Sequence, residues 1–320
     1  MLSLVEITSW HWAGFIVCVL VLLAIDLGVF HREAHTVKFK EALVWSFVWF
    51  SLAMLFAVAL KPLRGEQEAL QFVTGYLVEL SLSMDNVFVI ALIFAYFHIP
   101  PKLQHRVLYW GIVGALVMRG VMIGVGVALI SLVDWVLYLF GAFLLYSGCK
   151  MLFVETKVDP GRNRVVRWAR KFYPVAPELD GQKFVTEWQG RKALTPLALV
   201  LLMVETSDLL FAVDSIPAVF AVTRKPFIVF TSNVFAILGL RSLYFVLAGA
   251  IGYFRYLKYG LPLVLVFMGA EMLLDPHDRP AKWFQVEMPT SVSLLVVVSI
   301  LLTSIVLSVF AARAEQKGDE

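Results

Sequence analysis

The chain has 320 residues, of which 60% are hydrophobic and only 16% are charged. A water-soluble protein of this length could not bury so much apolar surface, so the composition excludes a soluble globular protein and indicates a multi-pass membrane protein. The formal net charge is only +3, and the basic residues cluster between apolar runs, so nothing favours a nucleic-acid partner.

Long apolar runs follow one another along the chain, and each has the roughly 17 to 25 or more residues that a helix needs to cross a bilayer. They predict an all-α polytopic membrane protein with about nine transmembrane helices. The expected spans are residues 10–30, 42–60, 70–97, 107–132, 134–150, 193–223, 227–251, 257–274 and 290–311. No Lys or Arg precedes Trp10 and no small-residue cleavage site follows the first run, so we expect that run to be retained as a span.

The loops alternate in charge. Loops after the odd-numbered spans carry roughly three times as many Lys and Arg residues as the others. Because positive loops stay in the cytoplasm, we expect the N-terminus outside and the C-terminus in the cytoplasm. The densest of these segments, residues 155–192, carries nine Lys and Arg residues from Lys157 onward. It predicts a basic cytoplasmic loop that lies partly on anionic lipid headgroups, with a regulatory or partner-docking role as the alternative.

The sixth span contains the most unusual stretch, ETSDLLFAVDSIP at residues 205–217. Glu205, Asp208 and Asp214 are the only charged residues between positions 193 and 223. An ionised side chain at the centre of a membrane helix costs roughly 3 kcal/mol. We therefore interpret the three carboxylates as part of a cation site; a buried structural ion pair is the alternative.

The third span repeats this pattern in ELSLSMDNVF at residues 79–88, where an acid is again followed after five residues by Asp and a small polar residue. Further matches lie downstream in the same order. The paired positions are Glu79 with Asp208, Asp85 with Asp214, Asn86 with Ser215, Arg119 with Arg241, and GCKML (148–152) with GAEML (269–273). Ordered matches indicate an internal repeat. The loop charges give its two copies opposite directions, which predicts an inverted three-plus-three helix repeat, spans three to five and six to eight. Such repeats are typical of secondary transporters with a site near the midplane.

This repeat divides the chain into five parts. They are two N-terminal transmembrane helices (1–69), the first repeat (70–154), the basic loop (155–192), the second repeat (193–275), and a C-terminal helix with its tail (276–320).

The candidate metal ligands are all oxygen donors: Glu79, Asp85, Asn86, Glu205, Asp208, Asp214 and Ser215. None of the six histidines or two cysteines falls in these stretches, and hard oxygen ligands favour manganese, magnesium or calcium over zinc or copper. Residues seven apart return to one face of an ideal helix, which aligns Glu79 with Asn86 and turns Asp85 about a third of a revolution away.

Three further residues bear on this site. We expect Arg119 and Arg241 to pair with carboxylates and hold the empty site, or to be purely structural. Pro217 cannot donate a hydrogen bond to the carbonyl of Val213, which predicts a helix break beside Asp214.

The acids exceed the bases by about three charges, which a divalent cation with one or two protons would neutralise. Asp26 and Glu271 lie near span ends, where we expect solvated or capping residues.

Four motifs resemble signatures of the TerC family of integral membrane proteins: DLGVFHR (26–32), ELSLSMDNVFV (79–89), ETSDLLFAVDSIPAVFAVT (205–223) and TSNVFAILGLRSLYF (231–245). The resemblance covers roughly residues 10–275 and implies export of divalent metal, chiefly manganese, across the bacterial inner membrane. By this resemblance, the family's acidic positions correspond to Glu79, Asp85, Glu205, Asp208 and Asp214, with Asn86 and Ser215 beside them. One departure is Glu271, where the family usually has Lys, which changes the charge at the outer end of the eighth span.

We therefore expect a secondary transporter that is not an enzyme, needs no cofactor, and moves a divalent cation, manganese first, across a lipid bilayer, in exchange for protons. The alternative is a calcium or other cation/proton antiporter. A scaffold that acts through the basic loop, and an intramembrane hydrolase using Asp85 and Asp214, are the readings from other classes. The hydrolase lacks the Gly-x-Gly-Asp pattern of intramembrane aspartyl proteases, and there is no HExxH motif. Oligomeric state is left open by the sequence.

Overall fold

The computed structural model describes residues 6–28, 39–133, 135–153, 164–248, 257–275, 285–286 and 288–318. Within these ranges, one helix occupies each predicted span: α1 (Ser9–Gly28), α2 (Phe39–Arg64), α3 (Glu66–Tyr96), α4 (Pro101–Leu132), α5 (Val136–Phe153), α7 (Pro196–Val222), α8 (Pro226–Ala248), α9 (Leu257–Leu274) and α10 (Thr290–Gly318). Three predicted span ends, Phe30, Asp134 and Ile251, lie outside the described residues.

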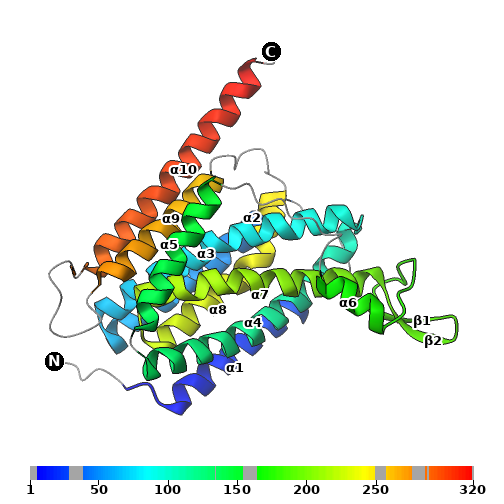
Figure 1. The fold of residues 1–320 in the computed structure, drawn as a ribbon, viewed down its shortest axis with the longest axis horizontal. Coiled ribbons are helices and arrows are strands. Elements are labelled where there is room, and N and C mark those ends of the chain that lie inside the picture. The colour runs from blue at the N-terminus through cyan, green and yellow to red at the C-terminus, as the bar shows by residue number, and fades with distance from the viewer. Residues whose placement is uncertain are drawn as a thin grey trace.

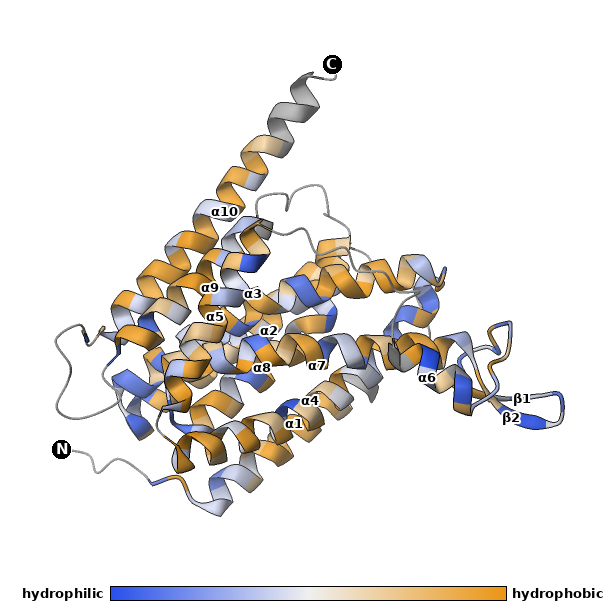
Figure 2. Ribbon diagram, in the orientation of Figure 1, coloured by the Kyte–Doolittle hydropathy of each residue, from blue (hydrophilic) through white to orange (hydrophobic). Residues whose placement is uncertain are grey.

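Of the helices described, seven are long and apolar enough to cross a membrane, namely α2, α3, α4, α5, α7, α8 and α10. The apolar parts of α1 and α9 are shorter within the described residues, Ser9–Ile25 and Tyr259–Leu274. Hydrophobic residues run along the length of the helices, as Figure 2 shows. The prediction of an all-α polytopic membrane protein is confirmed at this level, and the crossing of all nine helices stays a prediction.

Several helix ends follow from local sequence signals. Pro101 and Pro196 occupy the first turns of α4 and α7, where the missing N–H of proline costs nothing. The Thr195 hydroxyl caps α7 by accepting a hydrogen bond from the Ala198 N–H at 3.3 Å. Gly65 adopts a φ of 91°, which only glycine reaches without strain, and so lets the chain turn from α2 into α3 with one residue.

The central helices α3 and α7 are antiparallel. At the end where α3 begins, the Thr223 hydroxyl at the end of α7 donates a hydrogen bond to Gln71 Oε1 at 2.9 Å. At the other end, Tyr96 of α3 and Pro196 of α7 line the same groove. We call these the Glu66 end and the Tyr96 end of the bundle. Helix α3 also packs against α8, and α4 packs against both α7 and α8 (Figure 1).

Helices α5 and α9 form the closest pair, again antiparallel, with α10 beside α9 (Figure 1). A Cβ atom added to Gly148 would lie 2.8 Å from the Pro262 carbonyl oxygen. One added to Gly269 would lie 2.8 Å from the Gly141 carbonyl oxygen. Small residues at such positions let two membrane helices approach backbone to backbone.

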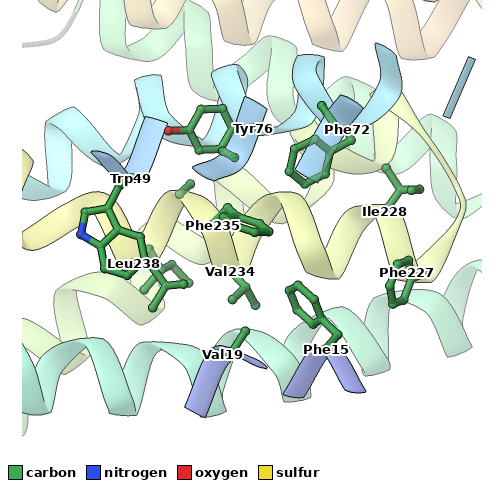
Figure 3. Packing of buried hydrophobic residues seen from close by; sticks show 14 of the residues in the cluster. Phe15, Val19, Trp49, Phe72, Tyr76, Phe227, Ile228, Val234, Phe235 and Leu238 are labelled. Atoms are coloured by element: carbon green, nitrogen blue, oxygen red, sulfur yellow. The ribbon is translucent and has the colours of Figure 1, made fainter. Parts of the chain in front are cut away.

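Buried apolar side chains form three clusters. The first lies between α1, α2, α3, α4 and α8 and is rich in aromatic rings; Phe72 and Phe235 meet edge to face with centroids 5.7 Å apart (Figure 3). The second cluster fills the Tyr96 half of the bundle and includes Ile90 and Met203. The third fills the Glu66 half and includes Phe220 and Met268. The acidic stretches of α3 and α7 lie between the second and third clusters.

An ion-pair network ties α2, α3 and the start of α8 together at the Glu66 end. Glu68 is buried, and it accepts hydrogen bonds from Arg64 Nε at 2.8 Å and from Lys225 Nζ at 2.7 Å. Both of its oxygens are therefore paired with a positive charge, which is what a buried carboxylate needs.

Replacing Glu68 with Ala is expected to lower the midpoint of thermal unfolding in detergent by several degrees. The change removes an acceptor that two cations share, at a cost of about 2 kcal/mol. Glu66→Ala is the matched control, because Glu66 and Lys61 are 3.4 Å apart with both side chains well exposed, where a pair contributes little. Equal midpoints for the two variants would contradict a stabilising role for Glu68.

The segment predicted as a basic loop is more ordered than expected. Over its described residues it forms helix α6 (Arg164–Phe172) and a hairpin of β1 (Val185–Trp188) with β2 (Arg191–Leu194), at one end of the bundle beside the start of α7 (Figure 1). Residues 154–163 lie outside the described ranges. These elements were not predicted, because the helix is only nine residues long. Its inner face is also small, consisting of the buried Val166 and Ala169.

The hairpin turn has local causes. Gln189 and Gly190 both have positive φ angles, 52° and 73°, as a two-residue hairpin turn requires. Before the first strand, hydrogen bonds from the Thr186 hydroxyl and from Lys183 hold the pKa of Asp180 below its usual value. The outer side of α6 carries Trp168 and Phe172, both exposed, with ring centroids 4.5 Å apart. Exposed aromatic and basic residues on one short helix are typical of a membrane interface.

Candidate functional site

Arg119, on α4, is the centre of the buried polar network. Its side chain is 2% exposed, and it lies between Glu79 on α3 and Asp208 on α7. Two parallel hydrogen bonds join it to Asp208, from Nη2 to Oδ1 at 2.9 Å and from Nε to Oδ2 at 3.2 Å. Its Nη1 forms an ion pair with Glu79 Oε1. The bidentate geometry suits the planar guanidinium and fixes three helices around one charge.

Polar side chains from α3, α7 and α8 complete this network. Asn86 Nδ2 donates to Asp208 Oδ1 at 3.1 Å, and Arg119 Nη1 donates to Ser215 Oγ at 3.4 Å and to Asn233 Oδ1 at 3.3 Å. Asn233 was not among the predicted site residues, although three consecutive polar residues, Thr231–Asn233, in an apolar span could have indicated a buried polar site. The predicted pairing of Arg119 with carboxylates agrees with this arrangement.

Several buried oxygens of the network have no hydrogen-bond partner. They are Glu79 Oε2, Ser83 Oγ and Asn86 Oδ1. Buried polar atoms are nearly always hydrogen-bonded in folded proteins, so these oxygens are candidates to bind an ion, a water molecule or a proton.

A small cavity lies beside this network. It has a volume of about 20 Å³ and is lined by Asp85, Asn86, Arg119, Asp214 and Ser215 together with apolar side chains. This is room for one water molecule or one dehydrated cation. Asp214 also accepts a hydrogen bond from the Ser147 hydroxyl of α5 at 3.0 Å. The cavity therefore places one carboxylate from each acidic stretch on the same small volume.

The seven predicted ligands are divided among three places rather than gathered in one coordination shell. Glu79 and Asp208 contact Arg119, whereas Asp85 and Asp214 line the cavity, which is the separation that helical periodicity predicts. Glu205 is not among the residues that line the cavity, and its carboxylate lies against Gly114 of α4. Across the described chain, no group of three His, Cys, Asp or Glu side chains is placed to hold a metal ion.

Glu205 faces α4 at a glycine. A Cβ atom added to Gly114 would overlap the Glu205 carboxylate, so only glycine leaves room for this acid. Its Oε2 is buried and has no hydrogen-bond partner. Glu205 lies three residues before Asp208, on the side of the network toward the Tyr96 end.

Two predictions about α7 and α8 have different outcomes. Pro217 does not break α7, which continues as a helix to Val222. Proline removes only one backbone hydrogen bond, and the neighbouring Ile216 and Val219 are packed in the third cluster, which holds the helix together. Arg241 is buried in α8, and its pairing with a carboxylate stays a prediction.

Glu271 is buried, contrary to expectation. It is 8% exposed, because α10 covers the end of α9 and the Ser293 hydroxyl donates a hydrogen bond to Glu271 Oε1. Asp26 lies in the last turn of α1, and its side chain is outside the described residues.

Comparison with known proteins agrees with this membrane architecture. Residues 64–316 match the model of the family described as "Integral membrane protein TerC family". The chain is 51% identical over 309 residues to the "Uncharacterized membrane protein STKORF319" of Myxococcus xanthus, covering 96% of this chain and 94% of the relative. It is 46% identical over 320 residues to the "Putative membrane-bound redox modulator Alx" of Escherichia coli K12, covering 97% of each chain.

No solved structure matches the chain. The family match covers most of the sequence and includes both acidic stretches and Arg119. The relatives are aligned over nearly their whole lengths, so the similarity is not confined to one motif. The chain therefore belongs to the TerC family of integral membrane proteins.

Proposed function

We propose that the protein is a secondary transporter that exports a divalent cation, manganese first, through the cavity between Asp85 and Asp214. The observation that carries this proposal is the pair of acids, one from each acidic stretch, on a 20 Å³ cavity inside the bundle. Carboxylate, amide and hydroxyl oxygens are available there from Asp85, Asn86 and Ser215, and such oxygens suit manganese, magnesium and calcium.

The charge balance of the site supports a divalent cation. Among the described residues, the five acids Glu79, Asp85, Glu205, Asp208 and Asp214 are opposed by Arg119 and by Lys150, whose charge acts on Asp214, which leaves three negative charges, 5 − 2 = 3. Arg119 is held by Glu79 and Asp208, so the two acids of the cavity are the ones left for a cargo. Three protons, or one divalent cation with one proton, would neutralise the surplus, so binding of the metal would displace two protons, which supports exchange of the metal for protons.

The packing on both sides of the cavity supports alternating access. The second cluster lies toward the Tyr96 end and the third toward the Glu66 end, so apolar side chains separate the cavity from both surfaces. A transporter that exposes one site to each side in turn has such an occluded state between its two open ones.

Reciprocal contacts between the helices support the predicted inverted repeat, and with it a transporter. The two copies are offset by 121 residues here, so position 141 of the first copy corresponds to 262 of the second, and 148 corresponds to 269. The contact of Gly148 with Pro262 therefore has a counterpart in the contact of Gly269 with Gly141. In the same way, the packing of α3 on α8 exchanges with that of α7 on α4. Two copies of a unit related by a pseudo-two-fold axis pack in this reciprocal way.

In this proposal the N-terminus is outside, the C-terminus is in the cytoplasm, and the membrane is the bacterial inner membrane. The Tyr96 end is then cytoplasmic and the Glu66 end is the side of release. The protein acts without a cofactor and is not an enzyme.

The experiment is a manganese-loading assay in cells that express the wild type, Asp85→Asn or Asp214→Asn at equal levels. Total cell manganese, calcium, zinc and iron are measured by elemental analysis. We expect the wild type to lower cell manganese several-fold and both variants to lose that effect, because each removes one charge from the cavity. Glu187→Gln, the same loss of charge at an exposed position of β1, is the matched control and should behave as the wild type.

The other outcomes are distinct. If only calcium changes, the site is kept and manganese is wrong. If both cavity variants lower manganese as the wild type does, the cavity is not the route. If no metal changes, the transport proposal is overturned. Oxidation state of the cellular thiols is followed in the same cells, because Alx is called a redox modulator.

A further inference from the structure

A second polar cavity opens at the Glu66 end of the bundle. It has a volume of about 450 Å³ and lies between the start of α3, the end of α7, the end of α9 and the start of α10. Its polar lining residues include Gln67, Gln71, Thr223, Glu271, Asp275 and Ser293. A polar cavity of this size holds many water molecules, at about 30 Å³ each. We call it the outer cavity.

Glu271 is the unusual residue of the outer cavity. It is buried, and one of its oxygens accepts the hydrogen bond from Ser293. The other, Oε2, is buried and has no hydrogen-bond partner. A buried carboxylate oxygen without a protein partner, at the edge of a polar cavity, is placed to bind a cation, a proton or a water molecule.

The basic residue at the outer cavity is paired with Asp275. Among the described residues that line the cavity, Arg224 is the only basic one, and its Nη2 lies 3.6 Å from Asp275 Oδ2. The described lining residues thus carry two negative charges, on Glu271 and Asp275, and one positive charge, on Arg224, 2 − 1 = 1. The surrounding Gln71 and Thr223 side chains add neutral oxygens and are held together by their own hydrogen bond.

This composition suits a hydrated divalent cation. Two carboxylates with amide and hydroxyl oxygens are hard ligands, and the volume leaves room for most of the hydration shell. A cation held by one or two carboxylates and by water binds weakly, with a dissociation constant on the order of 0.1 to 1 mM. Weak binding is what a site of passage needs, because an ion must leave it again.

The outer cavity lies in line with the central one. Along α7, Ser215 of the central cavity and Thr223 of the outer cavity are eight residues apart, or about 12 Å. Between them lies Phe220, which belongs to the third cluster and also lines the outer cavity. Phe220 packs so closely on α4 that a Cβ atom at Gly126 would come within 2.7 Å of its ring. An ion that passed this aromatic layer would enter the outer cavity.

We propose that the outer cavity is a second, low-affinity divalent-cation site in which Glu271 is the anchoring carboxylate, occupied by the ion after it leaves the central cavity. This inference rests on the proposed function for the ion that reaches it, but the site itself is a binding property that is measured without transport.

The test is manganese binding to the purified full-length protein in detergent, followed by the loss of the electron paramagnetic resonance signal of free hydrated Mn²⁺. We expect the wild type to show a weak class of sites in addition to any at the central cavity. Glu271→Gln keeps the shape of the side chain and removes its charge, so it should weaken that class at least tenfold. Glu271→Lys should abolish it.

Three further variants make the result specific. Glu66→Gln removes an exposed acid at the same end and should leave the weak class unchanged. Ser293→Ala keeps the Glu271 carboxylate and should retain the weak class, which separates loss of charge from loss of packing. Asp214→Asn alters the central cavity only, so the weak class should persist in it.

The two proposals fail in different ways. If Glu271→Gln binds weakly held Mn²⁺ as the wild type does, Glu271 is a structural acid and the outer site is overturned, whatever the cell assay shows. If the weak class is lost in Glu271→Gln while Asp85→Asn and Asp214→Asn still lower cell manganese as the wild type does, the outer site stands and the transport route through Asp85 and Asp214 does not. Loss of the weak class in Glu66→Gln as well would mean diffuse surface binding, and would also overturn the outer site.

Discussion

Replacing Arg119 with Met is expected to reduce the stability of the folded protein by about 3 to 5 kcal/mol. Glu79 is 0% exposed and Asp208 is 8% exposed, and both contact the guanidinium. Without it, two buried carboxylates face each other with no positive charge between them. Removing one partner of a buried ion pair is strongly destabilising for this reason. The loss is a large part of the whole stability of a typical protein, about 5 to 15 kcal/mol.

The measurement is the unfolding midpoint in detergent together with the yield of monodisperse protein. Arg119→Lys keeps the charge but cannot make two parallel hydrogen bonds, so an intermediate loss is expected. Combining Arg119→Met with Glu79→Gln and Asp208→Asn removes all three charges and should recover much of the stability. If the Arg119→Met variant is as stable as the wild type, the ion pairs of Arg119 with Glu79 and Asp208 do not stabilise the folded protein.

The second large effect is expected at the contact of α5 with α9. Gly148→Val and Gly269→Val should each lower stability by about 3 kcal/mol or more, at the upper end of the range for overpacked cores. The added Cβ atoms would meet backbone atoms, which cannot rotate away. At Gly148 the nearest is the Pro262 carbonyl oxygen at 2.8 Å, and at Gly269 it is the Leu145 nitrogen at 2.6 Å. Relief requires the two helices to separate.

Gly124→Val is the control for this pair, because Gly124 lies in an apolar helix with nothing within 4 Å of an added Cβ atom. The unfolding midpoint of Gly124→Val should remain near that of the wild type, while the midpoints of Gly148→Val and Gly269→Val fall. Similar midpoints for all three would mean that α5 and α9 are not in backbone contact. A loss at Gly148 equal to that at Gly269 would agree with the reciprocal packing of an inverted repeat.

The helices were predictable from the sequence, whereas α6 and the hairpin were not. Bilayer thickness imposes a minimum number of apolar residues on every span. A run such as residues 290–311 therefore predicts a helix without any knowledge of the residues that pack against it. Helix α6 has no such constraint, because its stability comes from Val166 and Ala169 packing on residues of α7 that are distant in sequence. A short polar segment therefore gave too little signal.

Helical periodicity predicted part of the site. The angle between Glu79 and Asp85 on one helix is a local property, and their separation into an Arg119 contact and a cavity follows it. The identity of the partners was not local. Arg119 contacts Asp208 across 89 residues and Asn233 across 114, and nothing in the periodicity of α4 specifies which neighbours lie opposite.

The length and composition of the apolar runs define the membrane class, the positions of the long apolar helices and which of them contain charges, because the cost of placing each residue in lipid depends on that residue alone. The pairing of the charges, the cavity that two of the acids share and the burial of Glu271 under α10 follow from the tertiary structure. These depend on how each helix is rotated about its axis and on which helix lies beside it. That choice is made by close packing between residues far apart in the chain.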